Sequence, residues 1–92
     1  MIKSFGDEET ERFFNEGVVP PTLRQIENPA LRKLRMLDSA ESIVDISKVP
    51  GNRLEKIKSK PGKYSIRVND QYRVTFYWED GGPTLVRIVD YH

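Results

Sequence analysis

The feature that most constrains the fold is a two-residue alternation of apolar and polar side chains through residues 64–78. Such alternation is typical of strands that bury one face. The short polar segment Asn69-Asp70-Gln71 divides it into two runs and predicts a hairpin turn. We therefore expect two antiparallel strands whose buried face carries Tyr64, Ile66, Val68, Tyr72, Val74, Phe76 and Trp78.

Three further segments are interpreted as strands. A short strand is expected at the start, from Met1 to Phe5, and another near Leu54 to Ile57. The final strand is expected from Thr84 to Tyr91, after a turn formed by residues 79–83. Four or five strands, mainly antiparallel, would then form a single sheet.

Helices are expected in the first half of the chain. Asp7 can cap a helix that runs to about Glu16, where Gly17 is a natural terminator. A helical turn is expected over residues 22–26, after which Asn28 and Pro29 resemble the cap and first position of a second helix. That helix carries apolar residues at three-residue intervals, and helical periodicity ends near Val49. The expectation is an α+β fold, one domain over residues 1–92, with two or three helices packed on one face of the sheet.

Composition excludes several classes of function. The chain has no cysteine and one histidine, so disulfides, thiolate chemistry and a metal site are not expected. No glycine-rich phosphate-binding motif is visible, and we expect no cofactor. Without a signal peptide or an apolar run of about 20 residues, a cytoplasmic protein with no membrane contact is expected.

Positive charge is concentrated in one part of the sequence. Residues 53–73 hold seven Lys and Arg against two Asp and Glu, although the formal net charge of the chain is only +1. This excess favours an anionic partner, of which nucleic acid is the commonest. A solvated hairpin face rich in lysine is the alternative. The basic residues are Arg53, Lys56, Lys58, Lys60, Lys63, Arg67 and Arg73.

Two groups of side chains are candidates for chemistry on RNA. Arg67 and Arg73 should project from the sheet face opposite the apolar residues, where two guanidiniums could hold a phosphate; the alternative is an ordinary polar face. The ending Asp90-Tyr91-His92 offers groups for proton transfer and for stacking on a base. Attack by a 2′-hydroxyl needs a base, an acid and cations, all of which such residues supply without metal.

The whole chain also resembles a known family in the order of its motifs. The segments that carry the resemblance are RKLRMLD at residues 32–38, PGNRLE at 50–55, YSIRVNDQYRV at 64–74 and IVDYH at 88–92. They resemble the HigB toxins, including the GraT-like members, within the RelE/ParE superfamily. Two departures are a loop over residues 58–62 that is one residue shorter, with lysine for arginine, and Glu55 where some relatives have histidine. The Glu55 carboxylate would repel RNA unless it is paired with a lysine such as Lys58.

The resemblance implies a compact RelE-like fold, binding in the ribosomal A site and cleavage of messenger RNA there through a 2′,3′-cyclic phosphate. It implies a HigA-type helix-turn-helix antitoxin, through which alone the toxin would contact operator DNA. In the implied active site, Arg73 stabilises the phosphorane and Lys58 supplies charge or acts as base. Asp90, Tyr91 and His92 position the substrate and transfer protons. The RNA-binding set is Arg53, Lys56, Lys60, Lys63 and Arg67.

Two other functions remain open on the sequence. ParE-like proteins share this fold but inhibit DNA gyrase without cutting RNA. A simple RNA-binding module would need only the basic loop, and its tail would be dispensable. Arg73 together with Asp90, Tyr91 and His92 favours the nuclease, because neither alternative requires that set.

Overall fold

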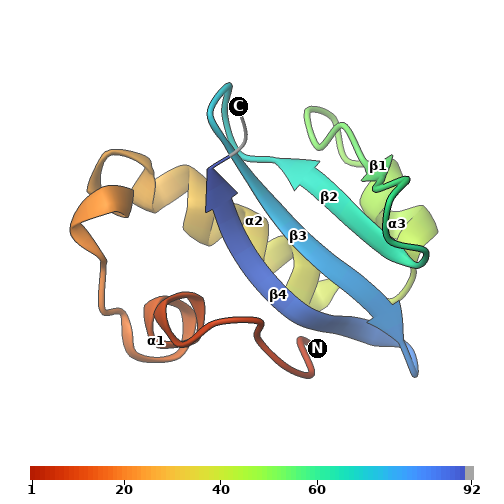
Figure 1. The fold of residues 1–92 in the computed structure, drawn as a ribbon, viewed down its shortest axis with the longest axis horizontal. Helices are drawn as coiled ribbons and strands as arrows, with labels where there is room; N and C mark the ends of the chain where they lie inside the picture. The colour runs from red at the N-terminus through yellow and green to blue at the C-terminus, as the bar shows by residue number, and fades with distance from the viewer. Residues whose placement is uncertain (91–92) are drawn as a thin grey trace.

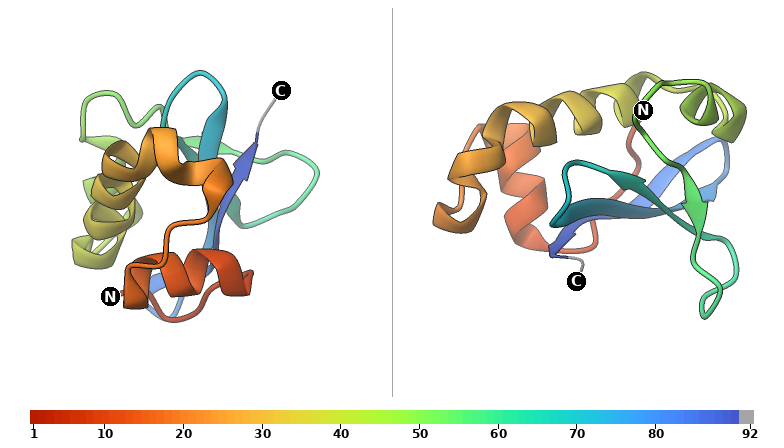
Figure 2. Two further views of the ribbon diagram at one scale, coloured as in Figure 1. Left: turned by 90° about the vertical axis from the view of Figure 1, so that its left-hand side faces the viewer. Right: turned by 90° about the horizontal axis from the view of Figure 1, so that it is seen from above.

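The computed structural model describes residues 1–90 and shows three α-helices, one 3₁₀ helix and a four-stranded antiparallel sheet. The elements in chain order are α1 (Glu8–Glu16), the 3₁₀ helix η1 (Pro21–Ile26), α2 (Glu27–Ser39), α3 (Ile43–Ser47), β1 (Glu55–Lys56), β2 (Lys63–Arg67), β3 (Tyr72–Glu79) and β4 (Gly82–Asp90). The strands lie in the order β1-β2-β3-β4 (Figure 1). All the helices lie on one side of the sheet (Figure 2), so the expected α+β arrangement is confirmed.

The core lies between α2 and the middle strands. Ala30, Leu34 and Leu37 of α2 are fully buried, as are Val74 and Phe76 of β3. Burying a side chain of the size of leucine or phenylalanine stabilises a fold by roughly 1.5–3 kcal/mol. The apolar side chains of α2 therefore pack against the apolar face of the hairpin, as the two periodicities predict.

The predicted opening strand is wrong in extent, because residues 1–5 form only an isolated parallel bridge between Phe5 and Val86. Lys3 N–H donates to the Pro83 carbonyl and Gly6 N–H to the Val86 carbonyl, each at 2.9 Å. The contact ends there because Asp7, the next residue, caps α1 through its carboxylate. Met1–Gly6 is nevertheless a backbone partner of the outer edge of β4.

The start of α2 also differs from the prediction. The 3₁₀ helix leads directly into α2 at Glu27, so neither Asn28 nor Pro29 stands where a cap and first position were expected. Pro29 is tolerated because the first four N–H groups of a helix have no intrahelical partner. The helix ends at Ser39, and Ser42 caps the separate helix α3 by accepting from the Asp45 N–H.

The turn between β3 and β4 is tighter than the five residues predicted. Asp80 and Gly81, both with positive φ, are its two central residues, as in the left-handed turns that suit twisted hairpins. A bulge follows in β4, where Leu85 also has a positive φ of 50°. The predicted strand end at Tyr91 lies outside the described residues. Within residues 1–90, no helix has the length and apolar character needed to cross a bilayer.

Candidate functional site

The sheet face opposite the helices carries a row of polar side chains. Residues that pair directly across antiparallel strands point to the same face. The register pairs Arg67 with Arg73, Ser65 with Thr75, and Lys63 with Tyr77. Because Ile66 and Val74 between them are fully buried against the helices, this row lies on the outer face. We call it the outer row, and it extends along the whole of β2.

Arg73 is the most enclosed charged residue of the outer row, with 8% of its surface exposed. Its Nε donates to the Ser65 hydroxyl at 2.9 Å, and its Nη2 donates to the Arg53 carbonyl at 2.6 Å. Its Nη1 lies 3.7 Å from a carboxylate oxygen of Glu55. The guanidinium is therefore oriented in advance by contacts to β1, to β2 and to the segment before β1.

Arg67 lies directly across from Arg73 and makes an ion pair with Asp70 in the hairpin turn. Two like charges at directly opposed positions are unfavourable in a sheet. Here a carboxylate accompanies each guanidinium, Asp70 beside Arg67 and Glu55 beside Arg73. The two arginines are thus directly opposed at the end of the sheet where β2 stops, with Arg67 contacting the hairpin turn and Arg73 contacting β1, β2 and the segment before β1.

Sequence reasoning missed Ser65, whose hydroxyl accepts from Arg73, and Thr75, its partner across the outer row. Ser65 is fully buried, and the Thr75 hydroxyl is buried with no hydrogen-bond partner among the described residues. Small hydroxyl side chains alternating with arginine on one strand face were the available signal. Glu55 was expected to repel RNA unless it is paired with a cation such as Lys58, and in the structure its carboxylate is paired with Arg73.

The predicted lysines lie at the other end of β2. Lys56, Lys58 and Lys63 line a pocket of about 390 Å³ together with Tyr64, at the hairpin between β1 and β2. Lys60 lies on the tip of that hairpin and is exposed, and Arg53 is also exposed. Two residues that line this pocket, Lys56 and Tyr64, are the chain neighbours of Glu55 and Ser65, which contact the Arg73 guanidinium.

Lys63 joins the two groups because it belongs to the outer row as well as to this pocket. Its amine lies 5.7 Å from the centre of the Tyr77 ring, a cation–π contact. Burial lowers its pKa, and the neighbouring charges of Lys60 and Arg87 lower that pKa further. A cation disfavoured by its surroundings gains most from an incoming anion.

Only the first residue of the predicted catalytic tail lies within the described part of the chain. Asp90 pairs in register with Tyr72, whereas its neighbour Val89 pairs with Arg73. The Asp90 carboxylate accepts from the Gln71 side-chain amide at 3.1 Å. Asp90 thus lies at the same end of the sheet as Arg73 but on the face toward the helices. Tyr91 and His92 lie outside the described residues.

A second cationic group lies on α2, outside the set of predicted site residues. Arg32 and Lys33 of α2 line a pocket of about 400 Å³ with Val49, Pro50 and Asn52. No sequence signal separated this pair from the exposed Arg35 on the same helix.

Comparison with known proteins gives consistent results. Over residues 3–92 the chain matches the model of a family described as the RelE-like toxin of the type II toxin-antitoxin system HigB. It is 40% identical over 86 residues to Toxin HigB-1 of Vibrio cholerae serotype O1, covering 88% of this chain and 87% of that protein. It is also 37% identical over 81 residues to an uncharacterized protein of Haemophilus influenzae, covering 83% of this chain and 77% of the other.

Proposed function

Because the chain belongs to the HigB-like family of RelE-like toxins, which act in type II toxin-antitoxin systems, we propose that it is a ribosome-dependent endoribonuclease. It would cut messenger RNA in the ribosomal A site without a metal ion, and so inhibit translation and growth. We place its action in the cytoplasm. Its proposed antitoxin is of the HigA helix-turn-helix type and provides the complex's contact with operator DNA.

The observation that carries this proposal is the Arg67–Arg73 pair on the outer face. Guanidiniums bind phosphate oxygens through paired N–H groups, and two arginines at directly opposed positions bring positive charge to one end of this face. The contacts of Arg73 to Ser65 and to the Arg53 carbonyl fix its direction before substrate arrives. Such preorganised charge is the largest source of transition-state stabilisation in many enzymes.

The proposed reaction is attack of a ribose 2′-hydroxyl on the adjacent phosphorus, with departure of the 5′-oxygen. Arg73 would neutralise the charge that develops on the non-bridging oxygens, and Arg67 would hold the phosphate. Tyr91 and His92 would orient the nucleotide and move the two protons, and Asp90, on the other face at the same end of the sheet, would help to position them. Lys58, which lines the pocket at the hairpin between β1 and β2, would supply positive charge or act as the base. Arg53, Lys56, Lys60 and Lys63 would contact further phosphates.

The test is to induce the chain in a bacterium and map new 5′ ends on a reporter message, with and without its translation. Cuts confined to the translated frame, and lost in Arg73→Ala, would support a ribosome-dependent nuclease. Arg24→Ala is the matched control, because it removes an exposed arginine from η1 on the helix side. Growth arrest without cuts, accompanied by DNA damage, would indicate a gyrase inhibitor instead.

A further inference from the structure

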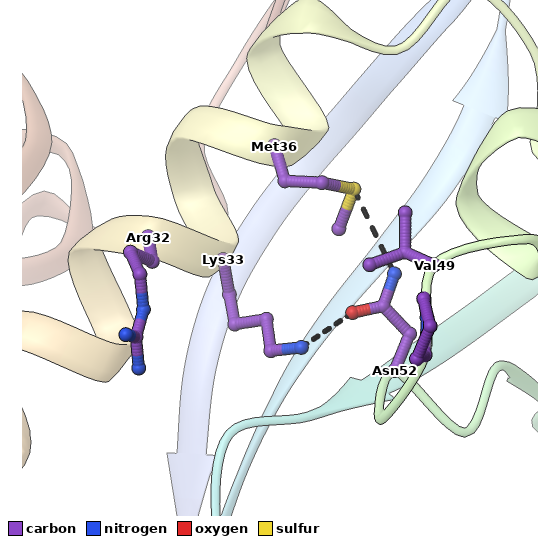
Figure 3. Close-up of a pocket in the computed structure, with 6 residues that line it drawn as sticks. Arg32, Lys33, Met36, Val49 and Asn52 are labelled. Atoms are coloured by element: carbon purple, nitrogen blue, oxygen red, sulfur yellow. Dashed lines mark hydrogen bonds between the residues drawn. The ribbon is translucent and has the colours of Figure 1, made fainter.

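The pocket beside α2 is a cationic site that lies outside the outer row. Lys33 reaches from α2 to Asn52, and Arg32 extends beside it from the same helix (Figure 3). The Lys33 amine donates to the Asn52 side-chain oxygen at 2.6 Å. Asn52 is 1% exposed, and its amide nitrogen donates to the Ile46 carbonyl at 2.9 Å. The position of the Lys33 amine is therefore set by a buried residue that is itself held in place.

The positive charge at this pocket is not balanced by the residues around it. Lys33 is bonded to a neutral amide, and in the part of the chain that the structure describes neither Lys33 nor Arg32 makes an ion pair. Burial lowers the pKa of Lys33, with further lowering by the charges of Arg32 and Arg67. An anion bound here would favour the charged form of Lys33 and so offset the lowering of its pKa by burial and by the neighbouring cations.

The pocket and the outer row share one wall. The Asn52 carbonyl accepts from the Arg67 N–H at 2.7 Å, while the carbonyl of the next residue, Arg53, accepts from the Arg73 guanidinium. Arg53 has a positive φ of 45°, a conformation that non-glycine residues rarely adopt outside sites where it is needed. Two consecutive residues thus fix Lys33 on one side and Arg73 on the other.

The wall shared by the pocket and the outer row bears on which anionic partner binds here, a strand of RNA or a protein carboxylate. A strand of RNA carries a phosphate at every nucleotide, so a strand held at Arg73 presents a second phosphate to a neighbouring cationic site. A protein carboxylate would have no such relation to Arg73. The observations therefore favour RNA.

We propose that the pocket lined by Arg32, Lys33 and Asn52 is a phosphate subsite for the same RNA that Arg67 and Arg73 hold, with Lys33 as the binding residue. Asn52 is its positioning residue. The inference rests on the proposed nuclease function, since it takes the strand at Arg73 to be the substrate. The pocket volume of about 400 Å³ is ample for a phosphate group with part of its sugar.

The experiment uses nuclear magnetic resonance on the full chain with the Asn52 side-chain amide as reporter. The probes are inorganic phosphate and a single-stranded 2′-O-methyl oligoribonucleotide, which has no free 2′-hydroxyl and is not cleaved. Both should shift the Asn52 signals to saturation. Lys33→Gln should abolish the phosphate effect, because glutamine can keep the hydrogen bond to Asn52 without the charge.

The salt dependence of oligonucleotide binding supplies a second measurement. Losing one phosphate contact should lower the slope of log affinity against log salt by about 0.7, equivalent to roughly fivefold weaker binding at 0.1 M salt. Lys33→Arg should retain the wild-type slope. Arg35→Gln, which removes an exposed charge from the same helix outside the pocket, should also retain it.

The proposal is overturned if both probes leave the Asn52 signals unchanged, or if Lys33→Gln keeps the wild-type salt slope. It is also overturned if Lys33→Gln weakens only the capture of the antitoxin, which would make the pocket a protein-binding site. Mapping of messenger RNA cuts separates the two proposals. If the wild-type chain cuts messenger RNA but neither probe shifts its Asn52 signals, only the subsite is refuted. If the probes shift those signals to saturation but no cuts are found, only the nuclease is refuted.

Discussion

Arg73 illustrates how a charged side chain is kept inside a small sheet. Its donors meet the Ser65 hydroxyl and the Arg53 carbonyl, two uncharged acceptors, and its ion pair is with a carboxylate that is itself 58% exposed. Polar acceptors satisfy the buried N–H groups without cancelling the positive charge. The guanidinium can therefore be fixed in place and still attract phosphate.

Replacing Glu55 by glutamine tests how much this carboxylate reduces the positive charge of Arg73 that is available to phosphate. A pair with one exposed partner contributes only about 0–1 kcal/mol to stability, so the free energy of unfolding should change little. Removing a negative charge next to Arg73 should tighten binding of a 2′-O-methyl oligoribonucleotide several-fold at low salt, and less at high salt. Fluorescence anisotropy at two salt concentrations measures this; weaker binding by Glu55→Gln would show that the carboxylate orients Arg73.

Lys33 gives a pH-dependent prediction. Its pKa in the folded chain is lowered from the ordinary 10.5, so between the two values the unfolded chain binds a proton that the folded chain has released. Stability rises with pH wherever the unfolded state binds more protons. The free energy of unfolding, relative to that of Lys33→Gln, should therefore increase as the pH approaches 10.5. Urea denaturation of both proteins measures the difference, and a flat or falling difference would contradict the lowered pKa.

At the scale of elements, the strands and helices follow from periodicity, and their ends do not. The hairpin of β2 and β3 could be predicted because alternation and a polar turn agree over 15 residues. The start of α2 could not, because the 3₁₀ helix before it removes the need for the cap that Asn28 suggests. Local signals mark where a helix can begin, whereas packing of Leu23 and Ile26 into the core decides where it does.

The turn between β3 and β4 is an element whose geometry makes a direct prediction. Gly81 has a φ of 80° with open space around its α-carbon, so an alanine there meets backbone strain and no clash. Gly81→Ala should lower the free energy of unfolding by about 1–2 kcal/mol. Urea denaturation measures the loss. Gly6→Ala is a contrasting variant, since its methyl group would lie about 2.3 Å from the Arg87 side chain at an ordinary φ.

At the scale of the whole molecule, the N-terminal residues and α1 are bonded to β4, the last strand. Phe5 packs on Phe14 at 5.9 Å between ring centres and bridges Val86, and Ile88 N–H donates to the Thr10 hydroxyl of α1. Phe5→Ala should cost about 2 kcal/mol, since the ring is only partly buried. Its unfolding by urea should remain one transition by both circular dichroism and Trp78 fluorescence. If fluorescence changed before circular dichroism, the contacts between the N-terminal residues and β4 would unfold separately from the rest of the fold.

The candidate site was predictable only where it follows strand alternation. That rule placed Arg67 and Arg73 on one face, and the register confirms that they lie opposite each other. It could not show that Arg73 is buried, nor bring Lys33 near Arg67, because those contacts join segments far apart in sequence. The convergence of Lys58 with Arg73 remains a prediction from resemblance.

The bonding of Met1–Gly6 to β4 has a consequence for how the protein is made. A chain is made from its amino end, so β4 is made after every other element of this fold, and until then Met1–Gly6 and α1 lack their contacts with it. A nascent chain carrying Arg73 on an unfinished sheet has neither a completed edge nor a completed core. Until β4 has been made, Arg73 therefore lies on a sheet that lacks both its last strand and the backbone partner of Met1–Gly6.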